Sequence, residues 1–552
     1  MPVFELDSDL VTGPAVPGAP DEPVLRIHEI QGAVLPGLNT IHQRLLGLRF
    51  DGAPDGLRGF LATVAPRVTT LAVAVDHRNE RRRALRRRAP RPVTPPLLSV
   101  ALSADALRAL RPDADEVRDV AFRTGMHARS SLGDPRDPGP GSPSTWRVGG
   151  SSETTPHLLA TVAADDEDAL DQAARALLGD AERAGAAVLY DETGHLLHDA
   201  KEHFGFRDGV SAPSVRGRLS ALDRHFLTRR YVHPDDPLAL THGRPGHPYV
   251  WPGQFVFGYP AQDERDAHAP LDPPPAFGPD WMRDGSFLVF RRLRQDVAAF
   301  RAGVTELREQ VRAQVGANLT DEHMAAMLVG RWPGGAALVR SPDAEEAGAM
   351  DRRLSVNHFG FAERTPDVRV PNDRWVEQEE LRPKPGVAET FTVVAGAASD
   401  DAGLRCPRFA HIRNVNPRDL TTDQGDAADT LARLVLRRGI TFGTPFPDDP
   451  AQQAGDDGDR GLLFLAYQTS LVDQFEMLNT RWMNREGAPE GRSGHDLLVG
   501  QAHGQDGRRA RLTLGRRDVA LTTRRDWVVP TGGGYFFAPS VSALRDLGAR
   551  PR

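Results

Sequence analysis

Three short segments of the sequence carry side chains that could do chemistry. HFGFRDGVS contains Asp208, AHIRNVNPRD contains His411, and LVLRRGITFG contains Arg437 and Arg438. A carboxylate can accept and return a proton, and a guanidinium can stabilise negative charge that grows during a reaction. A neutral imidazole is an ordinary protein ligand of haem iron. Together these residue types suggest proton transfer and charge stabilisation beside a bound metal.

Each segment also has a simpler interpretation. Asp208 precedes a glycine, which is typical of a tight turn with a surface carboxylate. His411 follows an apolar pair and could be a core histidine that binds nothing. Arg437 and Arg438 could end a strand in water. Because adjacent strand residues point to opposite faces, at most one of these arginines enters a given pocket.

The sequence has a single cysteine, Cys406. One cysteine excludes an internal disulfide, a multi-cysteine metal site and a CxxCH haem attachment, so any haem would be held non-covalently. We interpret Cys406 as a small buried apolar residue. There is also no HExxH motif that would compete with His411 as a metal site.

Strand-like segments followed by helix-like segments occur in both parts of the chain. The expected strands are 45–50, 157–163, 284–293 and 461–468, and the expected helices are 56–66, 165–180, 295–311 and 469–484. This pattern predicts an α+β fold of two similar halves, each with a mainly antiparallel sheet covered by helices.

The expected division of the chain is an extended arm over 1–30, an N-terminal half over 31–250 and a C-terminal half over 251–552. Eleven prolines between 233 and 279 predict a long irregular crossing between the halves. EHFGFRDG and NHFGFAER, one in each half, hint at duplication. The basic run over 77–92 favours a solvated surface loop over a nucleic-acid patch, because the chain is acidic and the run holds no aromatics.

Composition narrows the partners. A net charge of −7 at a pI of about 6.2 gives no reason to expect nucleic acid, and no run of eighteen apolar residues predicts a membrane span. The N-terminus has no basic head and no apolar core, so we expect a cytoplasmic protein. The oligomeric state, including a homo-oligomer, is left open by the sequence.

The order of the motifs carries more information than any one of them. GFRDG, AHIRNVNPRD, RRGITFG, GLLFLAYQTSLVDQFE and GGGYFFAPS follow one another. QGAVLPG precedes them near the start of the chain, and PGQFVFGYP and GSFLVFRRLRQDV lie between the first two. This combination resembles the dye-decolourising peroxidase family, and the resemblance extends from about residue 31 to about residue 540.

The resemblance implies two ferredoxin-like halves, as in the dimeric α+β-barrel superfamily, with one non-covalent haem b per chain in the C-terminal half. It implies that His411 is the iron ligand, Asp208 the distal acid–base residue and Arg437, rather than Arg438, the distal arginine. It further implies oxidation of dyes, phenols or similar aromatic reductants by hydrogen peroxide through a high-valent oxo-iron state. An aspartate base would predict activity that persists in acid, where a histidine base is protonated.

Three more positions follow from the same resemblance. Leu462 and Phe464 are placed like the pair that roofs the distal pocket. Asp526, ten residues before Phe536, is placed like the carboxylate that accepts a hydrogen bond from the iron-ligating histidine. Large dyes would need a route for electrons through the protein, and the aromatic candidates for surface oxidation sites are Trp482, Trp527 and Tyr535, although packing is the more common role for such residues.

Two alternatives remain. The first is a haem-binding protein that handles haem or iron without peroxidase turnover, since a fold does not fix a function. A carrier has no need of both Asp208 and Arg437 on the peroxide side. The second is a peroxidase packed as cargo in a protein shell, for which the tail SALRDLGARPR offers little apolar surface.

Overall fold

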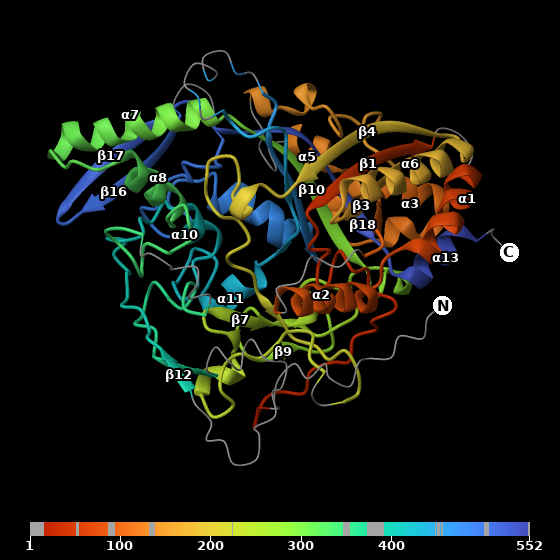
Figure 1. Cartoon of the computed structure of the whole chain (residues 1–552), viewed down its shortest axis with the longest axis horizontal. Helices are drawn as coiled ribbons and strands as arrows, with labels where there is room; N and C mark the ends of the chain where they lie inside the picture. The colour runs from red at the N-terminus through yellow and green to blue at the C-terminus, as the bar shows by residue number, and fades with distance from the viewer. Residues whose placement is uncertain are drawn as a thin grey trace.

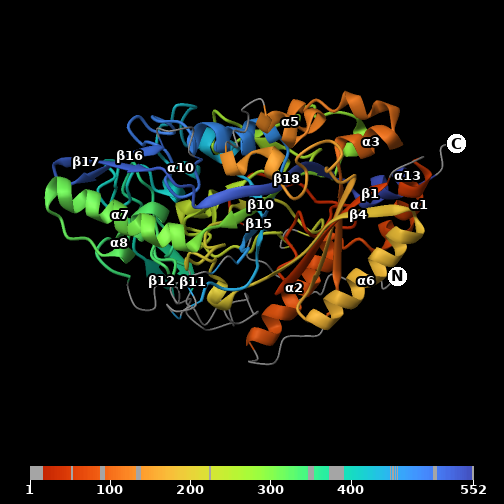
Figure 2. The ribbon, with the colours of Figure 1, turned by 90° about the horizontal axis from the view of Figure 1, so that it is seen from above.

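The structure is a computed structural model of the whole chain. It describes residues 16–50, 54–86, 94–131, 139–222, 225–345, 354–371, 391–447, 449, 453, 456, 458–501 and 507–549. The two expected halves lie side by side, with α1, α6, β1 and β4 at one end of the molecule and α7, α8, β16 and β17 at the other (Figures 1 and 2).

The N-terminal half is built on a four-stranded antiparallel sheet. Its strands are β1 (His42–Phe50), β2 (Leu97–Leu102), β3 (Leu158–Ala164) and β4 (Ala186–His195), in the order β2-β3-β1-β4. Helices α1 (Asp55–Val64) and α6 (Glu167–Arg183) follow the first and third strands. The side chain of Asp166 caps the start of α6 by accepting from the backbone N–H of Ala169.

The C-terminal half repeats this arrangement. Its strands are β10 (Ser286–Gln295), β13 (Leu436–Arg437), β14 (Ile440–Phe442), β15 (Gly461–Gln468) and β18 (Val528–Ala538). Strand β10 pairs with β18 on one side and with β15 on the other, and β15 pairs with both β13 and β14. The order β18-β10-β15-β14 therefore matches β4-β1-β3-β2 of the first half, and the predicted α+β fold of two ferredoxin-like halves is confirmed.

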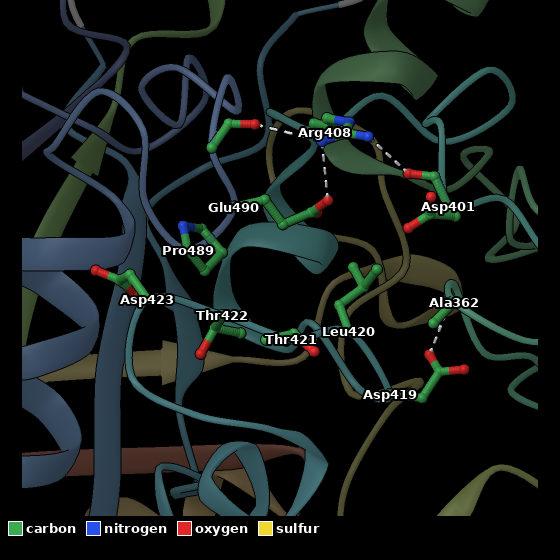
Figure 3. A pocket seen from close by; sticks show the side chains of 11 residues that line it. Ala362, Asp401, Arg408, Asp419, Leu420, Thr421, Thr422, Asp423, Pro489 and Glu490 are labelled. Atoms are coloured by element: carbon green, nitrogen blue, oxygen red, sulfur yellow. Dashed lines mark hydrogen bonds and ion pairs between the residues drawn. The ribbon is translucent and has the colours of Figure 1, made fainter.

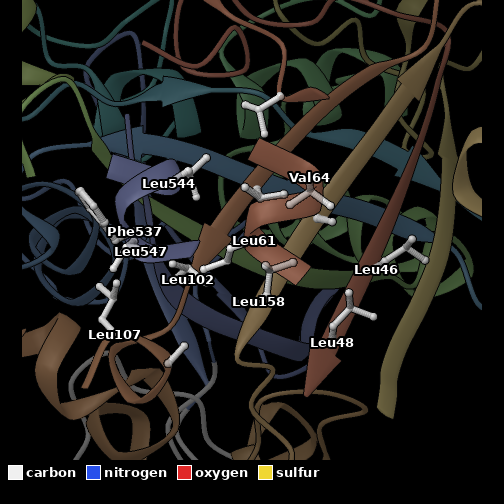
Figure 4. Packing of buried hydrophobic residues seen from close by; sticks show 14 of the residues in the cluster. Leu46, Leu48, Leu61, Val64, Leu102, Leu107, Leu158, Phe537, Leu544 and Leu547 are labelled. Carbon is white, nitrogen blue, oxygen red and sulfur yellow. The ribbon is translucent and has the colours of Figure 1, made fainter. Parts of the chain in front are cut away.

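The two sheets join edge to edge into one ring of strands. Each seam is narrow: Phe537 of β18 pairs with Leu102 of β2, and Phe442 of β14 pairs with Gly194 of β4. Inside the ring, apolar side chains of both sheets share one core. Outside the ring of strands, Leu61 and Val64 of α1 pack beside Leu158 in a second apolar cluster. This cluster extends across the seam to Phe537 (Figure 4).

The remaining elements are shorter or lie outside the two sheets. The helices are α2 (Leu71–Arg86), α3 (Ala104–Leu110), α4 (Val120–Thr124), α5 (Met126–Ser131), α7 (Val297–Val315), α8 (Asp321–Val329), α10 (His411–Val415), α11 (Ala427–Ala432) and α13 (Val541–Gly548). The strands are β5 (Ser214–Val215), β6 (His242–Arg244), β7 (His247–Val250), β8 (Ala261–Gln262), β9 (Pro270–Leu271), β11 (Val368–Pro371), β12 (Phe391–Val394), β16 (Arg508–Leu514) and β17 (Arg517–Thr523).

The hairpin β16–β17 lies along α7 (Figures 1 and 2). Between β4 and β10 the described residues form short strands, short 3-10 helices and turns, as the prolines predict. Of the helices that are described, none is both long and apolar enough to cross a membrane.

Two expectations about local structure were wrong, and a third was right in type but not in winding. The first part of the basic run, expected as a surface loop, is helical: it belongs to α2, which ends at Arg86 and in which His77 and Asn79 are buried. Residues 87–93 lie outside the described part of the chain. The helix expected over 469–484 is wound as π-helical turns over Leu471–Glu476 and Leu478–Trp482. The two FGF segments are not equivalent, since the first follows the fourth strand of its half and the second lies between the first and second strands of its half.

Candidate active site

Asp208 lies on a loop that holds its own shape. The carboxylate of Glu202 accepts hydrogen bonds from the backbone N–H groups of Phe204 and Phe206, both at 2.9 Å. The N–H of Asp208 donates to the carbonyl of Ala200 at 3.0 Å. Phe206 is buried, whereas the side chain of Asp208 keeps 41% of its surface exposed. The loop therefore anchors its apolar part and presents the Asp208 carboxylate.

Arg437 reaches this carboxylate from the other half of the chain. Its Nη1 lies 3.0 Å from Oδ1 of Asp208, and its Nη2 donates to the carbonyl of Ser211 at 3.0 Å. Arg438 turns elsewhere: its guanidinium is half-buried and donates to the carbonyls of Ala33 and Val34 at 3.2 and 3.0 Å. The structure thus brings together Asp208 and Arg437.

Leu462 and Phe464 lie on the same sheet face as Arg437. In the β13–β15 pairing Arg437 stands opposite Ala466, and residues two and four positions before Ala466 share its face. The side chains of Leu462 and Phe464 are half-buried, while Leu463 between them is buried in the core that the two sheets share. Arg437, Leu462 and Phe464 therefore lie on the same face of the sheet.

His411 begins α10 and is oriented by a buried carboxylate. Its Nδ1 lies 2.7 Å from Oδ2 of Asp496, whose side chain is 0% exposed. The other oxygen of Asp496 accepts from the backbone N–H groups of Leu498 and Val499 at 2.9 and 3.1 Å. With Nδ1 engaged, Nε2 of His411 makes no hydrogen bond to any described residue, and the ring remains 27% exposed.

The role expected for Asp526 is therefore corrected. The carboxylate on His411 is Asp496, and Asp526 instead lies 3.6 Å from Nε of Arg508. Spacing from Phe536 could not reveal this, because Asp496 comes from a separate turn over 496–500. A carboxylate just before an apolar LLV segment was the only signal in the sequence.

The position of α10 is fixed by the arginine that follows His411 by two residues. Arg413 is buried, and its Nε lies 2.6 Å from Oε1 of Glu490. Its guanidinium also packs over the ring of Phe361, with 4.7 Å to the ring centroid. A buried and fully engaged ion pair of this kind holds a short helix in one orientation.

One turn connects the two groups of residues. The N–H of Arg207 donates to the carbonyl of Pro333 at 3.1 Å, so the loop of Asp208 rests on this turn. Gly330, at the start of the same turn, has a φ of +93°, and a Cβ placed there would lie 2.4 Å from Cγ1 of Ile412. The backbone therefore passes directly against the residue after His411, which only glycine permits.

The residues present fit a haem. A single imidazole with one nitrogen held by a carboxylate and the other available is the donor that haem iron needs, since the macrocycle supplies four nitrogens. No cluster of three or more His, Cys, Asp or Glu side chains within the described ranges is arranged to hold a metal ion directly. Cys406 is buried, and burial raises the pKa of its thiol to about 12.

Buried positive charge near Arg437 also fits an anionic cofactor. Burial lowers the pKa of Arg331 to about 9 and that of Arg418 to about 10, and the charges of Arg418 and Arg437 contribute to the lowering at Arg331. Neither Arg331 nor Arg418 forms an ion pair with a described residue; both donate to backbone carbonyls. Arg418 has a φ of 60°, a conformation uncommon outside glycine. No pattern in the sequence indicated this pair.

A pocket of about 580 Å³ lies elsewhere, between the segments 419–423 and 489–491 (Figure 3). None of the predicted site residues lines it. Three of its four carboxylates already have partners: Asp419 accepts from the backbone N–H of Phe361 at 2.6 Å, and Glu490 holds Arg413. Asp423 accepts from Nε1 of Trp482 at 3.0 Å. These contacts give the pocket wall a structural role.

The three aromatic residues considered as surface oxidation sites are all buried. Trp482 and Trp527 are 0% exposed and Tyr535 is 3% exposed. Trp482 packs in a small apolar cluster, and Trp527 contacts Phe300 edge-on at 5.5 Å between ring centroids. Their packing role is therefore the one that the structure shows.

Comparison with known proteins gives relatives along nearly the whole chain. No protein-family model matches it. A dye-decolorizing peroxidase of Mycena epipterygia is 25% identical over 574 residues, covering 98% of this chain and 91% of the relative. A dye-decolorizing peroxidase of Mycetinis scorodonius is 28% identical over 484 residues, covering 83% and 77%.

Solved structures agree with these relatives. The structure of an ancestral D-type dye-decolorizing peroxidase superimposes with a TM-score of 0.71 at 27% identity, covering 96% of this chain and 100% of that one. A fungal DyP-type peroxidase of Auricularia auricula-judae, at 23% identity and a TM-score of 0.68 over 95% of this chain and 99% of that one, shows the same fold.

Fold, site and relatives define this protein first as a haem peroxidase of the α+β, ferredoxin-like class. Within that class, its relatives and the structure that superimposes at 27% identity are dye-decolorizing peroxidases.

Proposed function

We propose that the chain binds one haem b non-covalently through His411 and uses Asp208 and Arg437 to activate hydrogen peroxide. The observation that carries this proposal is the 3.0 Å contact between Arg437 Nη1 and Asp208 Oδ1. It places an acid–base group and a fixed positive charge together, on side chains that remain accessible.

Asp208 is suited to move the proton of peroxide. Reduction of hydrogen peroxide requires that one oxygen lose a proton and that the other gain one before it leaves as water, and a single carboxylate can do both in turn. Oδ1 of Asp208 accepts from Arg437 and from the backbone N–H of Gly209, at 2.6 Å for the latter. Oδ2 makes no hydrogen bond within the described chain, so it is available to take the proton.

Arg437 is suited to stabilise the charge on the departing oxygen. Negative charge grows there as the O–O bond lengthens, and a guanidinium already oriented beside it needs little reorganisation. Its Nη1 and Nη2 are held by Asp208 and by the carbonyl of Ser211, which fixes the plane of the group.

His411, oriented by Asp496, would hold the cofactor. Asp496 keeps the proton on Nδ1, so the lone pair of Nε2 is free to bind iron, and the carboxylate strengthens the imidazole as a donor. When bound, haem supplies the iron at which peroxide is reduced. Arg331 is buried and Arg418 is half-buried, and neither forms an ion pair with a described carboxylate; we propose that they offset the charge of the haem propionates.

The reducing substrate is proposed as an aromatic or dye-like compound. The relatives are named for decolorizing dyes, and Leu462 and Phe464 give the side of Arg437 an apolar border that suits an aromatic surface. A protein that only carries haem would gain nothing from an aspartate–arginine pair on the peroxide side, which argues against that alternative.

The test is to load the purified chain with haem and mix it with hydrogen peroxide in a stopped-flow spectrophotometer. We expect a rapid change in the haem absorption spectrum that is reversed by an anthraquinone dye, with loss of the dye's colour over many turnovers. A chain that binds haem stoichiometrically but reacts with peroxide no faster than free haem would instead be a haem carrier.

A further inference from the structure

Arg508 is a buried guanidinium directly behind the turn that carries Asp496. It is the first residue of β16 and its side chain is 0% exposed. Its Nη1 donates to the carbonyl of Leu497, the residue after Asp496, and its Nη2 donates to the carbonyl of Arg525. Its ring neighbour is Trp527, whose centroid lies 5.1 Å from the guanidinium carbon. The side chain therefore ties the Asp496 turn to the end of the β16–β17 hairpin.

Charges alternate along this line of residues. Oδ1 of Asp526 lies 3.6 Å from Nε of Arg508, which is too far for a hydrogen bond. This buried Nε has no hydrogen-bond partner among the described residues. Burial lowers the pKa of Arg508, and the negative charges of Asp526 and Asp496 oppose that lowering. Arg508 therefore interacts electrostatically with both carboxylates, one of which holds His411.

We propose that Arg508, in turn balanced by Asp526, is a positioning residue that sets how strongly Asp496 polarises His411. This inference rests on the proposed role of His411 as the haem ligand. A positive charge beside Asp496 takes up part of the carboxylate's negative potential, so the Nδ1 proton stays closer to the imidazole. Without that charge the imidazole becomes a stronger donor, and ferric iron is stabilised relative to ferrous iron.

The sign of the effect differs between the two partners. Arg508→Met removes a positive charge and should lower the reduction potential of the bound haem. Asp526→Asn removes a negative charge that partly cancels Arg508 and should raise it. Arg508→Lys keeps the charge but loses the forked donor geometry, so its potential should stay close to that of the parent. A residue with only a packing role would not move the potential in opposite directions.

The experiment is spectroelectrochemical titration of the haem-loaded full chain for the parent and these three variants. We expect at least a tenfold change in the ratio of reduced to oxidised haem at a fixed potential, which is about 59 mV for one electron. The matched controls are Arg511→Met and Asp518→Asn, an exposed pair on the same hairpin with 3.1 Å between Nη1 and Oδ2, which should give no shift.

The outcomes separate this inference from the proposed function. If His411→Ala leaves the spectrum of bound haem unchanged, the proposed ligand is wrong. If His411 is confirmed but Arg508→Met and Asp526→Asn both leave the potential unchanged, or shift it in the same direction, the inference is overturned. Equal shifts in Arg508→Lys and Arg508→Met would also overturn it. If Arg508→Met does not fold, Asp526→Asn decides alone: a rise supports the inference, and no change overturns it.

Discussion

Arg437 and Arg438 are neighbours in the chain, yet their guanidinium groups contact different parts of the molecule. Arg437 contacts Asp208, a residue from the other half, whereas the half-buried Arg438 donates to the carbonyls of Ala33 and Val34. The alternation of side chains along a strand produces this division, and it gives the two arginines separable roles.

Replacing Arg437 by leucine should therefore affect mainly the rate of the reaction with peroxide, and replacing Arg438 by leucine should affect mainly the free energy of unfolding. Arg437→Leu should slow the reaction with peroxide about 100-fold, as loss of a charge-stabilising donor typically does. Its ion pair is more than a third exposed on both sides, so the free energy of unfolding should change by less than about 1 kcal/mol. Arg438→Leu should lower the free energy of unfolding by roughly 1–3 kcal/mol, since it leaves buried carbonyls unpaired. Stopped-flow rates and urea unfolding of both variants measure the two effects, and a slower peroxide reaction in Arg438→Leu alone would reverse the assignment.

Asp208→Asn should slow the first reaction with peroxide by about 100- to 10,000-fold while leaving haem content unchanged, because the amide cannot accept the peroxide proton. The measurement is stopped-flow mixing with peroxide at pH 4 and pH 7. Since an ordinary histidine is protonated below about pH 6.5, a histidine base would predict a collapse of the parent's rate at pH 4. Such a collapse, or an Asn variant as fast as the parent at both values, would exclude Asp208 as the base.

His411→Ala should lose most of the bound haem, since one imidazole supplies the only protein bond to iron that the site offers among its described residues. Haem per chain, measured from absorbance after gel filtration, should fall and should recover in part when free imidazole is added. His42→Ala, a half-buried histidine on β1, is the control and should keep full haem content. Full haem content with an unchanged spectrum in His411→Ala would remove His411 from the site.

Glu202→Gln should change how stability depends on pH. Burial raises the pKa of Glu202 from 4.5 to about 7, and the nearby charge of Asp208 adds to this. The folded chain therefore holds a proton that the unfolded chain releases between these values, so the parent loses stability as pH rises from about 4.5 to about 7. The loss attributable to Glu202 is about 3 kcal/mol.

Urea unfolding at pH 4.5 and pH 7.5 measures this loss. The Gln variant should lack this component of the decline, whereas Glu80→Gln, at an exposed position on α2, should behave like the parent. If Glu202→Gln and the parent decline equally, Glu202 titrates in the folded chain as it does in the unfolded chain.

The repeated strands and helices were predictable because each has a clear hydrophobic period. The segments around β1, β10 and β15 alternate or are uniformly apolar, and α6 and α7 have one apolar face. Alternation also correctly indicated that only one of Arg437 and Arg438 can reach a given site. The helical winding of the basic run was missed because tertiary burial of His77 overrides the solvation that its charges favour.

The partner of His411 was beyond reach of the sequence for a physical reason. Asp496 is 85 positions away and is held by a turn whose shape depends on Arg508, itself buried by the β16–β17 hairpin. No local pattern records a contact between two loops that are ordered by a third element. The resemblance indicated a carboxylate of the right type at the wrong position, Asp526. This residue lies beside Arg508, which separates it from the turn of Asp496.

The narrow seams between the two sheets link the completion of folding to reactivity. Among the described residues, the strands of the two halves pair through their backbones only at Phe537–Leu102 and Phe442–Gly194, and Asp208 and Arg437 come from opposite halves. A chain in which only one half had folded would hold either Asp208 or the pair of Arg437 and His411, so the site proposed to activate peroxide would be incomplete. The division of the proposed site between the two halves would therefore make activation of peroxide depend on complete folding of the chain.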